Sequence, residues 1–213
     1  MTLTDRDAEI LDALTLRVRV LSIPQIARTW WPDAAEPERA ARTRLKALET
    51  EGLVHRFSLL AHPEIELTQP VFAWNMIYVP TQKSFASEFS GISWRLRCRW
   101  SESPHAIPAV IASTRAANLF SGHGGRYPRA AEHTHDLHLS QVFLRKRESI
   151  RPQFWISEER LRTEMRDTGF LPDAMIRLPE HSVIIEFGGA YSKSKIERFH
   201  RFCVEGNLPY ELW

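Results

Sequence analysis

The first 52 residues carry apolar and polar positions at the spacing of three short helices. Thr4 is the expected N-cap of the first helix, and Ser22 opens the second with a capping box that Gln25 completes. Pro37 suits the first turn of the third helix, and Gly52 suits its C-terminal end. Short helices at this spacing predict a helix-turn-helix.

The third expected helix has two unlike faces. Ala41, Leu45 and Leu48 fall together at 100° per residue. The opposite face carries basic and short polar side chains, namely Arg39, Arg42, Thr43 and Lys46. Such a helix suits the DNA major groove because Arg and Lys reach both phosphates and guanine edges. A solvated helix with salt bridges to Glu36 or Glu49 has the same pattern, and this alternative stays open.

Two strand-like runs follow the third helix, at residues 53–60 and 71–79. We expect them to pair across the loop at 63–69. Three helices and a hairpin predict a winged helix-turn-helix over residues 1–80, and Arg56 on the first strand joins the expected DNA contacts. The pattern does not indicate which DNA sequence is bound.

The middle of the chain is basic, with eleven basic and five acidic side chains in residues 83–151. Such an excess suits a surface that faces phosphates, and we expect residues 81–133 to form a basic connecting region. Residues 92–100 alternate at the period of a strand. A longer apolar pattern instead predicts a helix over 84–100, through Phe85, Phe89, Ile92, Leu96 and Trp100. Arg95 and Arg99 would lie one turn apart on it, and either phosphate contacts or pairing with Glu88 and Glu102 would explain them.

Three histidines, His133, His135 and His138, stand at the start of a helix expected at 134–149. Imidazole is a common zinc ligand, but no cysteine and no HExxH arrangement accompanies these residues. We therefore favour packed or hydrogen-bonded histidines. Cys98 and Cys203 lack CxxC spacing and indicate neither a disulfide framework nor a thiolate metal site.

Near the C-terminus, two apolar runs of strand length each carry one acid at an end. Asp173 opens the run at 173–178, and Glu186 lies near the end of the run at 182–187. Two carboxylates side by side can hold Mg²⁺ and leave room for a phosphate. Lys193 and Lys195 lie in the first turns of a helix expected at 192–205, from which either can reach back. The alternative is a turn acid, a paired acid and two solvated lysines.

The order of these elements resembles the core of the PD-(D/E)xK nuclease superfamily. A helix at 134–149 is followed by strands at 154–156, 173–178 and 182–187, the helix at 192–205 and a strand at 210–213, with an extra helix at 157–166. In that superfamily a lysine two residues after the second acid helps to activate water, whereas Gly188 stands at this position here. The resemblance implies an α/β (α+β) fold with a PD-(D/E)xK-like domain over 134–213.

The whole chain resembles the replication-relaxation family of plasmids and other mobile elements, which combines a winged helix with a nuclease-like part. The segments that carry this resemblance are His135–His138, Trp155–Leu161 with Glu158 and Glu159, Pro172–Ala174, Ile185–Phe187 and the basic helix with the aromatic-rich end that follows. The resemblance implies a role in plasmid replication, DNA relaxation or mobilisation. Double-stranded DNA is the expected partner, together with a second copy of the chain or other mobile-element proteins.

Three functions are consistent with the sequence. The first is a DNA-binding accessory protein with a nuclease-like domain that has lost activity. The second is a Mg²⁺-dependent endonuclease that uses Asp173, Glu186 and Lys193 or Lys195. The third is a winged-helix transcriptional regulator. A chain of 213 residues, 43% hydrophobic and 25% charged, without a signal peptide or an apolar run of membrane-spanning length, is expected in the cytoplasm.

Overall fold

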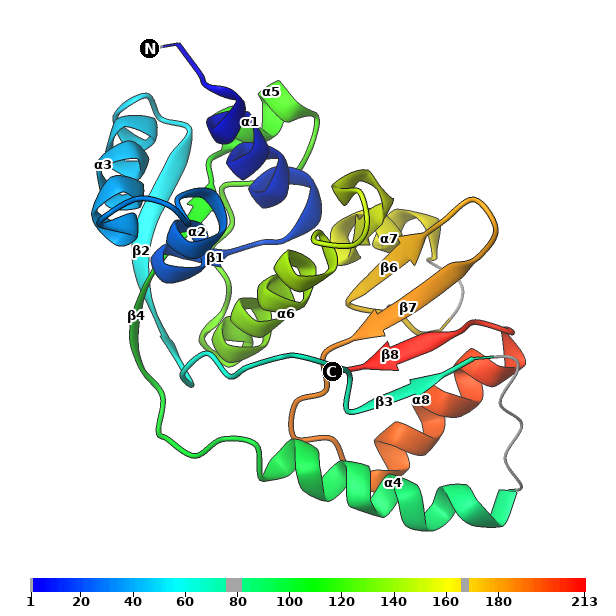
Figure 1. Ribbon diagram of the computed structural model, residues 1–213. Helices are drawn as coiled ribbons and strands as arrows, with labels where there is room; N and C mark the ends of the chain where they lie inside the picture. The colour runs from blue at the N-terminus through cyan, green and yellow to red at the C-terminus, as the bar shows by residue number, and fades with distance from the viewer. Residues whose placement is uncertain (1, 76–81, 166–168) are drawn as a thin grey trace. The chain divides into compact units, whose positions relative to one another are not determined.

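The protein is a mixed α/β protein with two sheets, and its computed structural model describes residues 2–75, 82–165 and 169–213. The chain divides into two compact units, shown in Figure 1. Unit 1 comprises Met1–Ile65 and Ser103–Pro152, and unit 2 comprises Glu66–Glu102 and Gln153–Trp213. These bounds do not coincide with the boundaries expected at 80 and 133. Within the described ranges, no helix has the length and apolar character needed to cross a membrane.

Unit 1 begins with the three predicted helices. Its elements are α1 (Asp5–Asp12), the π-helical turn η1 (Ala13–Arg17), β1 (Leu21–Ser22), α2 (Ile23–Trp30), α3 (Pro37–Thr50), β2 (Val54–Ala61), β4 (His105–Ala112), α5 (Thr114–Phe120), the 3-10 turn η2 (Ala130–Glu132) and α6 (His133–Lys146). The predicted caps are confirmed. Asp7 N–H donates to Thr4 Oγ1 at 3.3 Å, and Gln25 N–H donates to Ser22 Oγ at 3.0 Å.

The sheet of unit 1 has the antiparallel order β1-β4-β2. β2 pairs along its whole length with β4, from Val54 opposite Ala112 to Ala61 opposite His105. The expected hairpin between 53–60 and 71–79 is therefore wrong. Phe72–Trp74 forms β3 in the other sheet, and residues 76–79 lie outside the described residues. This pairing buries Ala109, Val110, Ile111 and Ala112 of β4 in unit 1.

Helix α6 packs against β1 and β2, as Figure 1 shows, and thus belongs to unit 1. Gln25 Nε2 donates to Leu137 O at 2.8 Å, which ties α6 to α2. His138 is fully buried, with Nδ1 2.7 Å from Thr134 O and Nε2 3.1 Å from Pro63 O. This helix, expected to open the nuclease-like domain, is thus grouped with residues 1–65 and apart from residues 153–213. Over the described ranges, no group of three or more His, Cys, Asp or Glu side chains is placed to hold a metal ion.

Unit 2 is built on a five-stranded mixed sheet of order β3-β8-β7-β6-β5. Its elements are β3 (Phe72–Trp74), α4 (Gln82–Arg97), the 3-10 turn η3 (Pro152–Phe154) at its border, β5 (Trp155–Ser157), α7 (Glu158–Glu164), β6 (Ala174–Arg177), β7 (Ser182–Glu186), α8 (Lys193–Glu205) and β8 (Tyr210–Leu212). Strands β5, β6 and β7 form an antiparallel meander. Helix α8 then crosses over to β8, which runs parallel to β7.

Helices α4 and α8 pack against each other and share the main core of unit 2 with the sheet (Figure 1). α8 buries Ile196, Phe199 and Cys203, whose spacing follows the helical period. A helix is confirmed for most of the expected range 84–100, and the strand alternative for residues 92–100 is wrong. However, α4 ends at Arg97, so Arg99 follows the helix instead of lying one turn after Arg95 on its face.

Candidate functional site

The two predicted acids meet where β6 begins and β7 ends. Ala174 pairs with Ile185 in the antiparallel ladder, so Asp173 before β6 lies beside Glu186 at the end of β7. Phe187 N–H donates to Asp173 Oδ2 at 2.7 Å, and Asp173 N–H lies 3.4 Å from Glu186 Oε2. The strand register therefore brings the two carboxylates together, as the sequence pattern predicts.

Glu186 is 4% exposed, and its carboxylate has a specific donor inside unit 2. Tyr191 Oη donates to Glu186 Oε1 at 2.5 Å. Burial raises the pKa of Tyr191, and the charges of Glu186 and Asp173 raise it further, so the hydroxyl stays protonated and able to donate. Sequence reasoning missed Tyr191, because an aromatic residue shortly after a strand gives no signal of this role.

Of the two predicted lysines, Lys195 is the one at the site. Its Nζ lies 3.4 Å from the centroid of the Tyr191 ring. Burial of the ammonium group lowers the pKa of Lys195, while the charges of Glu186 and Asp173 raise it, and the net shift is downward. Lys193 instead pairs with Glu197 at 3.6 Å on the exposed side of α8.

Position 188, where the superfamily pattern has a lysine, is closely packed. A Cβ built on Gly188 would lie 2.9 Å from Leu96 Cδ1 and 3.1 Å from Leu212 Cδ1. A long side chain at this position would have to displace Leu96 of α4. Lys195, whose Nζ lies over the Tyr191 ring, belongs to the first turn of α8.

Asp173 and Glu186 are the members of this acid–lysine cluster (Asp173, Glu186, Tyr191 and Lys195) whose oxygens could hold a hard cation. Carboxylate oxygens are the ligands that Mg²⁺ prefers, and the ion usually takes one or two of them while waters and substrate phosphate complete its shell. Lys195 is an exposed residue, so a phosphate can approach its ammonium group from solvent. The arrangement thus combines oxygen ligands with a cation close to both acids.

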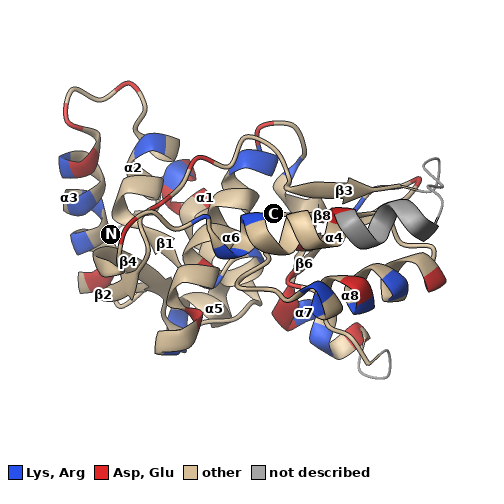
Figure 2. Ribbon diagram, turned by 90° about the horizontal axis from the view of Figure 1, so that it is seen from below, with Lys and Arg blue, Asp and Glu red and all other residues tan. Residues whose placement is uncertain are grey.

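The predicted DNA-binding face of α3 is exposed along its length. Ala41, Leu45 and Leu48 are fully buried, and all four predicted contact residues, Arg39, Arg42, Thr43 and Lys46, are exposed. Figure 2 shows basic and acidic bands alternating along this helix. Arg39 pairs with Glu36 at 3.1 Å and Arg42 with Glu38 at 3.0 Å. Exposed pairs of this kind contribute little to stability.

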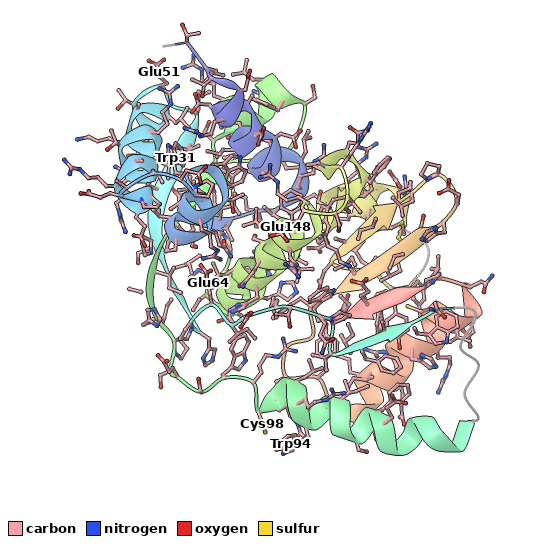
Figure 3. The ribbon with its side chains drawn as sticks, in the orientation of Figure 1. Trp31, Glu51, Glu64, Trp94, Cys98 and Glu148 are labelled. Atoms are coloured by element: carbon pink, nitrogen blue, oxygen red, sulfur yellow. The ribbon has the colours of Figure 1, made fainter. Side chains whose placement is uncertain are left out.

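A groove of about 630 Å³ runs beside this face, between α3, the start of α1 and the segment after α2. Arg6, Trp31 and Arg44 line it, and none of the three was singled out from the sequence. The Arg6 guanidinium lies 4.6 Å from the Trp31 ring centroid, and Figure 3 labels Trp31. Arg44 forms an ion pair with a buried acid, because its Nε donates to Asp7 Oδ1 at 2.8 Å.

The remaining predicted DNA contacts belong to other segments of the chain than α3. Arg56 on β2 donates from Nε to Glu49 Oε2 at 2.8 Å. Burial raises the pKa of Glu49, but the hydrogen bonds from Arg56 lower it more, and the net shift is downward. Arg95 is exposed on α4, where Figure 3 shows the neighbouring Trp94 and Cys98 on the side away from the sheet.

Arg99 occupies a partly buried position in unit 2. Its Nη2 donates to Trp213 O at 3.1 Å, and its guanidinium lies 4.8 Å from the Phe187 ring centroid. Burial lowers the pKa of Arg99 to about 10. The expected placement of Arg99 with Arg95 on one exposed helical face is therefore wrong, and Arg99 serves packing within this unit.

Comparison with known proteins identified no similar protein. A scan against protein-family models, a search of curated proteins and a search of solved structures each found no match. Functional inference therefore rests on the residues and their geometry.

Proposed function

We propose that unit 1 is a winged helix-turn-helix that binds double-stranded DNA through α3. The order of its elements supports this proposal, because three helices interleave with a three-stranded sheet in which β1 joins the β2–β4 pair. The observation that carries it is the division of α3 into a fully buried apolar face and an exposed face with three basic side chains. A helix with such an exposed face fits the major groove.

Binding of α3 would use two kinds of contact. Arg39 and Arg42 can form bidentate hydrogen bonds with guanine edges, whereas Lys46 supplies a point charge to a phosphate. Neutralising phosphates releases counterions, so affinity should fall steeply with salt. In a plasmid or other mobile element, such a protein would act as an accessory factor in replication, relaxation or mobilisation.

Fluorescence anisotropy with labelled duplexes between 50 and 200 mM salt tests this proposal. We expect Lys46→Ala to weaken binding to all duplexes and to reduce the salt slope by about 1. Arg160→Ala is the matched control, since Arg160 is an exposed basic residue on α7 of the other unit. Unchanged affinity and slope for Lys46→Ala, together with unchanged affinity for Arg42→Ala, would refute binding through α3.

We further infer that unit 2 is a PD-(D/E)xK-like core whose acid–lysine cluster cleaves phosphodiester bonds with Mg²⁺. The observation that favours this second function is the position of Lys195 within the field of both acids, which compensates for Gly188. The antiparallel meander followed by a helix and a parallel strand also agrees with that core.

Each residue of the cluster has a role in this proposal. Asp173 and Glu186 would hold the ion, which when bound polarises a phosphoryl oxygen and lowers the pKa of a water ligand. Lys195 faces the same place, where its charge would stabilise negative charge that develops on the phosphate. The cation–π contact of Lys195 Nζ with the Tyr191 ring, at 3.4 Å, supports this placement of the charge.

Cleavage is tested by incubating the full chain with supercoiled and linear DNA, with and without Mg²⁺ or Mn²⁺. We expect metal-dependent nicking by the parent and none by Asp173→Ala or Glu186→Ala. Glu197→Ala, on the exposed side of α8, is the control that should still nick. Binding without nicking under all conditions would refute the nuclease proposal and leave a DNA-binding protein with an inactive core.

A further inference from the structure

Tyr191 contacts both Glu186 and Lys195 of the acid–lysine cluster. Its hydroxyl donates to Glu186 Oε1 at 2.5 Å, while its ring face lies 3.4 Å from Lys195 Nζ. One side chain thus makes a hydrogen bond through its polar end and a cation–π contact through its ring.

Tyr191 is itself held firmly. It is 9% exposed, and its ring belongs to the main core of unit 2. Its carbonyl oxygen accepts from Ser93 Oγ of α4 at 2.8 Å, and its N–H donates to Gly189 O at 2.7 Å. Ser93 is 2% exposed, so this anchor comes from inside the core. The Tyr191 ring is therefore a rigid support for a flexible lysine.

We propose that Tyr191 is the positioning residue of this cluster, with its hydroxyl fixing the Glu186 carboxylate and its ring holding the Lys195 ammonium beside both acids. This inference rests on the proposed cleavage function of unit 2. It explains how a lysine on α8 can take the place of one at position 188. A lysine side chain on an exposed helical turn samples many rotamers, and a ring face at its tip restricts them.

The chemistry of Tyr191 agrees with positioning and not with nucleophilic attack. Its hydroxyl is buried and donates to Glu186 Oε1. A protonated phenol is a hydrogen-bond donor to a carboxylate, and such partners orient metal-binding side chains. The two contacts are separable, because Tyr191→Phe removes the hydroxyl and keeps the ring, whereas Tyr191→Leu removes both.

The contact with Glu186 is tested by calorimetric titration of the full chain with Mn²⁺ in the absence of DNA. We expect Tyr191→Phe to bind Mn²⁺ about 10-fold more weakly than the parent, as for other partners of metal ligands. Tyr210→Phe is the matched control, because Tyr210 is also buried in the same core and its hydroxyl contacts His200 Nδ1 at 2.9 Å. Equal Mn²⁺ affinity of the parent and Tyr191→Phe would overturn the role of the hydroxyl.

The contact with Lys195 is tested by NMR of the metal-free protein. The sequence contains five lysines, so the Lys195 ε-methylene signals can be assigned with Lys195→Arg. The aromatic ring current should shift them upfield in the parent and in Tyr191→Phe but not in Tyr191→Leu, with the Lys193 signals unchanged throughout. Absence of the shift in the parent, or its persistence in Tyr191→Leu, would overturn the role of the ring.

The two measurements also separate this inference from the function on which it rests. A parent protein that binds no Mn²⁺ refutes the metal site, and with it the proposed role of the hydroxyl. The ring-current shift needs no metal and decides the placement of Lys195 in either case. A parent that binds Mn²⁺ while Tyr191→Phe loses affinity, with Lys195 shifted as expected, supports the whole inference.

Discussion

The pair between Arg44 and Asp7 joins α3 to the start of α1, and we predict that Arg44→Met destabilises unit 1. Asp7 is fully buried. It accepts hydrogen bonds from Arg44 Nε at 2.8 Å and from the backbone N–H and hydroxyl of Thr4, both at 2.7 Å. Methionine keeps the apolar stem of Arg44 and removes its charge, so the change isolates the ion pair.

The size of the effect follows from what remains around Asp7. Removing one partner of a buried pair costs about 3–5 kcal/mol, since the other charge stays buried without compensation. Thr4 still supplies two donors after the change, and the Arg44 side chain is 27% exposed, so part of this cost is avoided. We expect a loss of about 2–3 kcal/mol, or roughly 1 M in the urea midpoint for a domain of this size.

The pH dependence gives the sharper test. Burial raises the pKa of Asp7, but the hydrogen bonds from Arg44 and Thr4 lower it more, and the folded-state value lies below the ordinary 3.8. A depressed carboxyl pKa contributes stability above the unfolded-state pKa, which is lost as the pH falls through the folded-state value. The difference between parent and Arg44→Met should therefore be full at pH 7 and shrink below about pH 3.8.

Urea titration followed by circular dichroism measures this difference, and hydrogen exchange of α1 and α3 peptides localises it to unit 1. Arg39→Met is the control, because the Arg39–Glu36 pair is exposed and should change stability by about 1 kcal/mol or less. Equal urea midpoints for Arg44→Met and the parent at pH 7, or a difference that grows in acid, would show that this reasoning is wrong.

Three further changes test the packing of both units. Leu45→Ala, at a fully buried position of α3, should cost about 2–5 kcal/mol in urea unfolding, and a loss below 1 kcal/mol would contradict tight packing there. Gly188→Ala should lower stability by about 1 kcal/mol, because its Cβ would meet Leu96 Cδ1 at 2.9 Å, and a gain in thermal stability would contradict this. A thiol reagent should modify exposed Cys98 in the native protein and Cys203 only after unfolding, since Cys203 is buried and burial raises its pKa; fast native reaction at Cys203 would refute its placement.

Local signals in the sequence predicted the helices of unit 1 well. Thr4 and Ser22 cap the first two helices as expected, since a capping box depends on residues three apart. The two faces of α3 are confirmed for a similar reason, because residues on one helical face are near neighbours in sequence. The meeting of Asp173 with Glu186 was also predictable, since one antiparallel pair of neighbouring strands creates it.

Long-range choices could not be predicted in the same way. The pairing of β2 with β4 passes over a nearer segment, because the energy of a strand pair comes from burial and not from proximity along the chain. The amphipathic pattern of helix α6 does not indicate which unit it packs against. Long-range contacts such as that of Gln25 Nε2 with Leu137 O place it in unit 1. Tyr191 depends on Ser93, 98 residues earlier, and no local pattern records such an anchor.

Charge compensation within unit 2 links the strand register to the proposed chemistry. Two carboxylates held side by side, one of them buried, repel each other unless donors and cations compensate for them. Phe187 N–H and the Tyr191 hydroxyl supply dipoles, and protonated Lys195 supplies one full positive charge. A divalent cation held between the two carboxylates would add positive charge at the same place, as the proposed cleavage requires.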